Sequence, residues 1–226
     1  QGKQNELVIF LENLDTRLAT HQLGKNNEKG LLDITNLVLK DLKTDLDKNE
    51  QELAKNFSDL ENWDFLNHGT ETPHYWFYRL EYYLWKNGIE NDENLHIGGK
   101  DFSDIRKNFY FRNLNSVEHI HPQSVDGWGK DNEIREIDKF GNLALLSVGF
   151  NSSLNDNAGQ EKYTKLLAKV QKDEVESLKL WLVYAKHYNK EKESWEWDKD
   201  KAKTHQNQML KILRESLKIE TKTSTI

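Results

Sequence analysis

Residues 116–123 read Ser-Val-Glu-His-Ile-His-Pro-Gln, a short alternating segment that Pro122 ends. Alternation of this kind predicts a β-strand, in which neighbouring side chains point to opposite faces. Glu118 and His119 would then lie on opposite faces unless the backbone twists, whereas His119 and His121 would share a face. A Glu-His pair taken alone is more typical of a solvated strand edge than of a catalytic site, so its meaning depends on the residues that follow.

A second short strand is predicted over residues 141–147, where Gly-Asn opens the apolar run Leu-Ala-Leu-Leu-Ser. Asn151 and Asn155 come next, and helical periodicity resumes near Gly159. The predicted order is therefore strand, long loop, strand and helix. Asn155 and Asn157 are better explained as turn or helix-cap residues than as ligands.

Helical periodicity marks most of the remaining chain. Apolar residues recur at helical spacing before residue 100 and again after residue 158, with polar residues between them. The helices expected cover residues 7–18, 31–42, 75–85, 159–171, 173–188 and 198–219, and the charged stretch 44–61 is expected to be a solvated helix or a connector. These patterns predict a mainly α-helical, α+β protein with a small two-strand element between helical halves.

An aromatic run over residues 75–85 has clear helix boundaries. Thr72 is the predicted N-cap, Pro73 suits the first helical position, and Gly88 follows the expected end. Aromatic side chains at this density are expected to form a core with neighbouring helices rather than to stack on bases. The Lys-rich stretch 186–203, which also carries two tryptophans, is interpreted as a solvated, partly packed connection rather than a nucleic-acid patch.

The composition limits the kinds of site that this protein can build. Its 226 residues include no cysteine, so any metal must be bound by His, Asp, Glu or Asn. A mean hydropathy of −0.88 argues against a membrane span, and the lack of cysteine favours a reducing, cytoplasmic setting. The start at Gln1 rather than Met is typical of a fragment of a longer protein. The net charge of −6 argues against a purely electrostatic nucleic-acid binder.

Three motifs in this order carry a resemblance to a known family: Glu-His-Ile-x-Pro-Gln, Gly-Asn-Leu-x-Leu-Leu-Ser and Asn-Ser-Ser-Leu-Asn. Together they resemble the HNH (His-Asn-His, ββα-metal) nucleases, and most closely the C-terminal nuclease domain of GmrSD-type modification-dependent restriction enzymes. The resemblance is strong over residues 116 to about 165 and reaches the flanking helices only in general character. It implies an N-terminal helical region over residues 1–99 and an HNH domain over residues 100–226, with a ββα-metal core at about 114–171.

The resemblance also implies roles for individual residues. His119 is the general base that takes a proton from water, because a neutral imidazole can accept it near neutral pH. Glu118 and Asn151 bind one divalent cation through oxygen atoms, most simply Mg²⁺. Asn142 ties the loop between the two strands and orients the histidine through its backbone. The implied activity is metal-dependent hydrolysis of DNA phosphodiester bonds.

Three further residues have more than one interpretation. His121 fills the variable position of the first motif and is a second metal ligand, a phosphate contact, or a packed surface histidine. Two imidazole ligands would favour Mn²⁺, Ni²⁺ or Zn²⁺. Lys162 and Lys165 lie on the helix after the second strand, where they would contact the DNA backbone or belong to a solvated helix face.

Members of the GmrSD-like group usually carry an N-terminal ParB-like NTPase domain that senses nucleotide and modified DNA. This chain has no G-x-x-x-x-G-K-S/T phosphate loop, so the resemblance implies an effector part of a restriction or antiphage system that works with such a sensor. DNA is the expected partner. The sequence does not decide whether the protein forms a homodimer that cuts both strands. The alternative is an inactive helical DNA-binding or assembly module built around an HNH-like element.

Overall fold

The computed structural model describes residues 2–23, 63–90, 94–124, 127–131, 133–154, 159–189 and 191–217. Its contacts group the chain into two compact units, one of residues Gln1–Asn62 with Leu213–Ile226 and one of residues Trp63–Ile212. The predicted helix over 31–42 and the charged segment 44–61 lie outside the described residues. Residues 63–99 belong to the same compact unit as the nuclease motifs, and the domain boundary after residue 99 stays a prediction.

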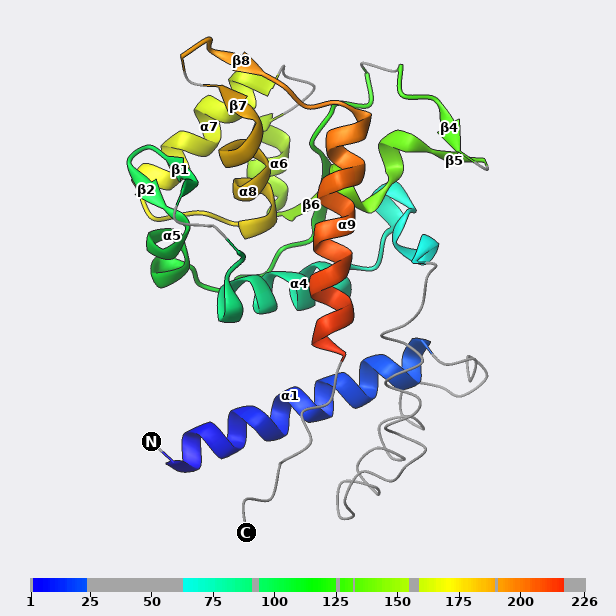
Figure 1. Cartoon of the computed structure of the whole chain (residues 1–226), viewed down its shortest axis with the longest axis vertical. Coiled ribbons are helices and arrows are strands. Elements are labelled where there is room, and N and C mark those ends of the chain that lie inside the picture. Colours follow the sequence, from blue (N-terminus) through cyan, green and yellow to red (C-terminus); the bar gives the residue numbers. More distant parts are fainter. Residues whose placement is uncertain are drawn as a thin grey trace. The chain divides into compact units, whose positions relative to one another are not determined.

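The first unit contains helix α1 (Gly2–Leu23), which confirms the predicted N-terminal helix (Figure 1). Five consecutive apolar side chains of this helix, from Leu7 to Leu11, are between 43% and 57% exposed. The leucine spacing therefore predicted the helix but not a buried face for these residues. No described helix has both the length and the apolar character needed to cross a bilayer.

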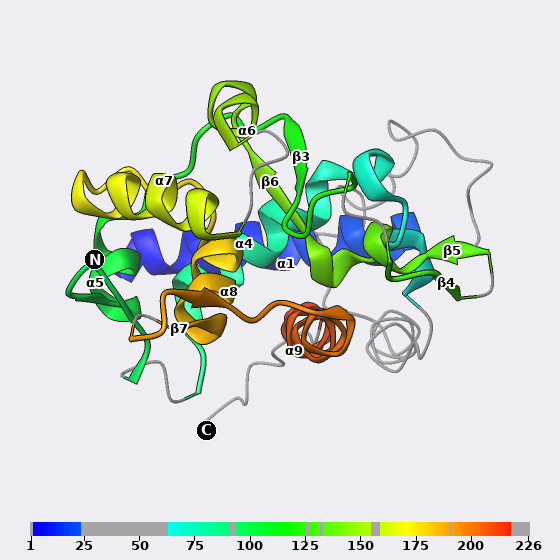
Figure 2. The same cartoon turned by 90° about the horizontal axis from the view of Figure 1, so that it is seen from above.

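Figure 1 and Figure 2 show the remaining described helices, which belong to the second unit except for the end of the last helix from Leu213, which is grouped with the first unit. They are α4 (His74–Asn87), α5 (Phe102–Asn108), α6 (Val148–Leu154), α7 (Gly159–Gln171), α8 (Leu178–His187) and α9 (Lys199–Ser216). Short 3-10 turns join them: η1 (Asp64–Leu66), η2 (Gly69–Glu71), η4 (Glu136–Asp138) and η5 (Phe140–Asn142). The structure thus confirms a mainly helical, α+β fold.

The two predicted strands pair with each other in the middle of this unit. β3 (Ser116–His119) runs antiparallel to β6 (Leu143–Leu146), with Ser116 opposite Leu146 and His119 opposite Leu143. Helix α6 follows β6 directly, so strand, loop, strand and helix occur in the predicted order. The other described strands are short hairpins: β1 (His96–Ile97) with β2 (Lys100–Asp101), β4 (Lys130–Asp131) with β5 (Ile134–Arg135), and β7 (Tyr188–Asn189) with β8 (Ser194–Trp195).

Two helix boundaries differ from the sequence prediction. The N-cap at Thr72 is wrong: Pro73 takes that position, because the Thr72 hydroxyl donates to the Leu66 carbonyl at 3.0 Å. Helix α8 begins at Leu178 rather than near residue 173, because Ser177 caps it by accepting a hydrogen bond from the Leu180 amide at 3.0 Å. Gly88 ends α4 as predicted, with φ at 70°.

The aromatic face of α4 forms the core of the second unit. Trp76, Phe77, Leu80 and Leu84 are buried, and α4 packs against α8 and β6. The Phe77 ring lies 5.0 Å from the ring of Phe140, which begins η5 just before β6. The predicted core role of this aromatic run is confirmed, and burial of each such side chain stabilises the fold by roughly 1.5–3 kcal/mol.

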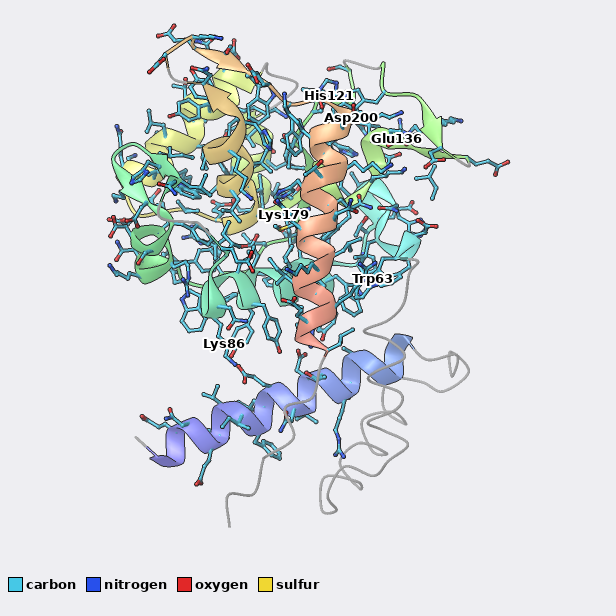
Figure 3. The ribbon with its side chains drawn as sticks, in the orientation of Figure 1. Trp63, Lys86, His121, Glu136, Lys179 and Asp200 are labelled. Carbon is cyan, nitrogen blue, oxygen red and sulfur yellow. The ribbon has the colours of Figure 1, made fainter. Side chains whose placement is uncertain are left out.

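A buried polar link joins α4, α8 and the start of β6. Glu81 on α4 accepts hydrogen bonds from the Ser177 hydroxyl at 2.6 Å and the Leu178 amide at 2.7 Å. Lys179, in the interior of the unit (Figure 3), donates to the carbonyls of Phe140 and Leu143, the latter at 2.5 Å. The η5 turn that carries Asn142 is therefore fixed by hydrogen bonds from the buried Lys179 side chain as well as by apolar packing.

Candidate active site

His119 is the last residue of β3 and its side chain is nearly enclosed, with 7% of it exposed. Its Nε2 atom lies 2.9 Å from Asp138 Oδ1 and 3.2 Å from Gln123 Nε2. Burial lowers the pKa of His119 below its ordinary value of 6.5, and Asp138 opposes this shift only in part. The imidazole is therefore neutral near pH 7, the state in which it can accept a proton.

Asp138 ends the η4 turn and is held by a second partner. Arg135 donates to it twice, from Nε to Oδ2 at 2.6 Å and from Nη2 to Oδ1 at 3.0 Å. Burial alone would raise the pKa of Asp138, yet the bonds from Arg135 and His119 outweigh burial and keep that pKa below its ordinary value. The group beside His119 is therefore an ionised carboxylate.

Asn142 is fully buried at the end of η5, directly before β6. Its Oδ1 accepts hydrogen bonds from the His121 amide at 2.8 Å and the Trp197 indole Nε1 at 3.0 Å. Its Nδ2 donates to the Ile137 carbonyl at 2.9 Å, and its own carbonyl accepts from the Ile120 amide at 2.9 Å. One side chain thus joins the end of β3 to the start of β6 across the long loop.

Glu118 points to the opposite face of β3 from His119, as strand geometry predicts. Its Oε1 lies 2.5 Å from Lys162 Nζ, and the same ammonium group donates to the His119 carbonyl at 2.9 Å. Lys162 comes from α7 and is 3% exposed. Its side chain therefore points into the site rather than outward, and it joins the strand to the helix.

Asn151 lies in α6, the helix that follows β6 directly. Its Nδ2 donates to Ser116 Oγ at 2.6 Å. Because Ser116 and Glu118 are two residues apart on β3, they share a face of the strand, and Asn151 lies beside that face. The amide nitrogen is used for this contact, which leaves Oδ1 as the atom that can bind a cation.

The donor groups on this face fit a hard divalent cation. Glu118 supplies a carboxylate on this face, and Asn151 adds an amide oxygen. Within the described ranges, no three His, Asp or Glu side chains gather at one point that could hold a metal ion. Two protein oxygens with water completing the shell is the coordination that Mg²⁺ commonly adopts.

The remaining predicted site residues lie further out. The His121 ring stacks on Trp128 with centroids 4.4 Å apart, the packed arrangement that was one of its three interpretations. Lys165, on α7, donates to the Ser153 carbonyl. It also borders a shallow hollow of about 280 Å³, whose lining includes Lys169 and Lys172.

Sequence reasoning missed three residues that hold the site together: Asp138, Lys162 as the partner of Glu118, and Trp197. Asp138 lies in a stretch with several charged residues, so no spacing rule separated it from its neighbours. Trp197 falls in the Lys-rich segment that was interpreted as a partly packed connection. Its side chain is 6% exposed, which confirms the packing but adds an unpredicted bond to Asn142.

Comparison with known proteins identifies the family of this chain. A model of the C-terminal domain of GmrSD restriction endonucleases matches residues 50–212, well over half of the chain. The matched stretch includes β3, β6, α6 and α7 with every candidate site residue. No curated protein and no solved structure matches the chain significantly. The chain therefore belongs to the family of GmrSD restriction endonuclease C-terminal domains.

Proposed function

We propose that this protein is a metal-dependent DNA endonuclease that acts as the effector domain of a modification-dependent restriction system. The observation that carries the proposal is the buried, neutral His119 at the end of β3, with the oxygen donors Glu118 and Asn151 on the other face of the strand. A general base and a cation site are the two elements that phosphodiester hydrolysis needs. Membership of a restriction endonuclease family supports DNA as the substrate.

Each side chain has a separate task in this proposal. His119 removes a proton from the attacking water, and its low pKa keeps it ready to do so at neutral pH. Glu118 and Asn151 would hold the divalent cation, which when bound would stabilise negative charge on the phosphate and the leaving oxygen. Asn142 keeps the end of β3 in place, so that His119 does not shift during the reaction.

The lysines of α7 take different tasks. Lys162 is turned inward, where it stabilises the buried charge of Glu118, so we place it with the cation site rather than with DNA. We propose Lys165 as a contact to the DNA backbone, because it lies on the partly exposed side of the same helix near two more lysines. A ParB-like NTPase sensor would bring this acidic chain to DNA.

The test is plasmid nicking by the purified chain with Mg²⁺ or Mn²⁺, followed on an agarose gel, with EDTA as the metal-free arm. We expect nicking by the wild type and loss of nicking in His119→Ala, Glu118→Gln and Asn151→Ala, with thermal unfolding showing that each variant folds. His96→Ala, at an exposed histidine of β1, is the control and should nick like the wild type. DNA binding without cleavage, and no metal-dependent thermal shift, would instead support the inactive module.

A further inference from the structure

We propose that Asp138 is the positioning residue of the general base: its carboxylate fixes the His119 ring so that Nδ1 is the nitrogen that accepts the proton. This inference rests on the proposed function, because it assigns a task to the contact between His119 and Asp138. The two residues are 19 positions apart in the chain, and the loop between β3 and β6 brings them to a distance of 2.9 Å.

The chemistry of the contact determines the tautomer. An ionised carboxylate can only accept a hydrogen bond, so His119 Nε2 must carry the hydrogen that lies between the two groups. In a neutral imidazole the other nitrogen, Nδ1, then holds the lone pair. The side-chain amide nitrogen of Gln123 lies 3.2 Å from the same Nε2. If the Gln123 amide is flipped, its oxygen takes this place and accepts a hydrogen bond from the same N–H group.

Arg135, the residue that precedes η4, holds Asp138 in place. The two bonds from the guanidinium group, at 2.6 and 3.0 Å, engage both carboxylate oxygens and leave little freedom to rotate. The Arg135 side chain is 48% exposed, whereas that of Asp138 is 16% exposed. The arginine therefore shields the carboxylate from solvent and fixes its plane.

A second segment, distant in the chain, also packs against Asp138. Gly69, in η2, adopts φ of 56°, and a Cβ atom added to it would lie 2.7 Å from Asp138 Oδ1 and 3.0 Å from Asp138 Cγ. Backbone thus packs directly against the carboxylate at a position that leaves no room for a side chain. Asn67 fastens the same segment to the loop by accepting a hydrogen bond from the Phe140 amide at 3.0 Å. Arg135, three residues before Asp138, and the distant segment that carries Gly69 therefore hold one carboxylate against His119.

The experiment compares Asp138→Asn with Asp131→Asn in the full chain. Asp131 lies in β4 of the same loop and its only described ion pair is with Lys139, so its replacement makes the same charge change away from His119. Initial rates of plasmid nicking over a range of DNA concentrations separate kcat from KM. In parallel, ¹H–¹⁵N correlation spectra of histidine-labelled, metal-free protein report which His119 nitrogen carries hydrogen, with His119→Ala assigning the signal.

We expect Asp138→Asn to lower kcat about 10- to 100-fold with little change in KM, as loss of a group that orients a functional side chain commonly does. We also expect a slowly exchanging Nε2-bound hydrogen on His119 in the wild type and in Asp131→Asn, and its loss or displacement in Asp138→Asn. Wild-type kcat in Asp138→Asn, or hydrogen on Nδ1 in the wild type, would overturn the inference. If the wild type does not cleave at all, the proposed function fails, and the spectra alone decide whether Asp138 fixes the tautomer.

Discussion

Glu118 and His119 are adjacent in the chain, yet they belong to two different sets of contacts. The alternation of a strand predicts this separation, and the structure places Lys162 with the acid and Asp138 with the histidine. The identities of these two partners could not be predicted. Lys162 is 44 residues from Glu118, and Asp138 is 19 residues from His119. The helical pattern of α7 does not show which lysine points inward, and the loop sequence does not distinguish Asp138 from the other acidic residues near it. Asn142 was named through the resemblance to the HNH nucleases, whose motif here is local in sequence.

Close packing at Gly69 gives a prediction with a matched control. Gly69→Ala should lower the nicking rate, because the new methyl group would displace Asp138, whereas Gly99→Ala should leave the rate unchanged. Both glycines have positive φ, at 56° and 83°, so both variants carry backbone strain of about 1 kcal/mol, but Gly99 has open space around it. Nicking rates and urea unfolding of the two variants check this. An equal loss of activity in Gly69→Ala and Gly99→Ala would show that backbone strain, and not displacement of Asp138, lowers the nicking rate.

The buried pair of Lys162 and Glu118 gives a second prediction at this scale. Lys162→Met should lower the free energy of unfolding by roughly 3 kcal/mol, because it leaves Glu118 buried without its ammonium partner. Lys165→Met, three residues further along the same helix, changes a more exposed side chain and should cost less than about 1 kcal/mol. Urea unfolding of both variants measures the difference. An unfolding free energy for Lys162→Met within error of that for Lys165→Met would contradict the buried pair.

Among the elements, α4 and α8 show how the helical part supports the strands. The sequence predicted α4 and its aromatic core from periodicity and from Gly88. It placed the start of α8 too early, because the cap at Ser177 depends on Glu81 from another helix. The 3-10 turns η2 and η4 were not predicted, since three-residue turns leave no periodic pattern. Gly69 lies in η2 and Asp138 lies in η4. The two turns that the sequence did not predict are therefore those that place a carboxylate against His119.

The link between α4 and α8 predicts a pH dependence of stability. Burial raises the pKa of Glu81 from 4.5 to about 7, against the opposing hydrogen bonds from Ser177, Leu178 and Lys179. The folded state therefore binds this proton more tightly than the unfolded state. The contribution is fully present below about pH 4.5 and is lost as the pH rises through about 7, with a total of at most about 3 kcal/mol.

Urea unfolding of the wild type and Glu81→Gln between pH 5 and pH 8 tests this dependence. The wild type should lose stability relative to Glu81→Gln as the pH rises over this range. Glu71→Gln, at an exposed glutamate of η2, is the control and should follow the wild type. A difference between wild type and Glu81→Gln that does not change with pH would show that Glu81 does not bind the proton in the folded state.

For the whole molecule, charge limits what the chain can do alone. With 38 acidic against 32 basic residues, it should bind DNA weakly without a partner, and salt should weaken binding further. Lys165→Gln should raise the DNA concentration needed for half-maximal nicking while leaving the maximal rate unchanged, because a backbone contact stabilises the bound state and the transition state equally. Nicking rates over a plasmid concentration series measure this. A fall in the maximal rate instead would place Lys165 at the reacting groups.

The three motifs were sufficient to predict the family and the order of the ββα elements, because each motif is local in sequence. Arrangement at larger scale was harder to predict. The described contacts place residues 63–99 in one compact unit with the nuclease motifs, since Asn67, Gly69 and Tyr78 all contact the region after residue 109. Contacts over such distances leave no trace in periodicity or composition.

The role of His119 is tested most directly by the rate of plasmid nicking by His119→Ala compared with the wild type, at equal protein concentration with Mg²⁺ or Mn²⁺. We expect metal-dependent nicking by the wild type that EDTA abolishes, and no nicking above background by a folded His119→Ala protein. Equal nicking by the two proteins would show that His119 is not the general base of a DNA endonuclease.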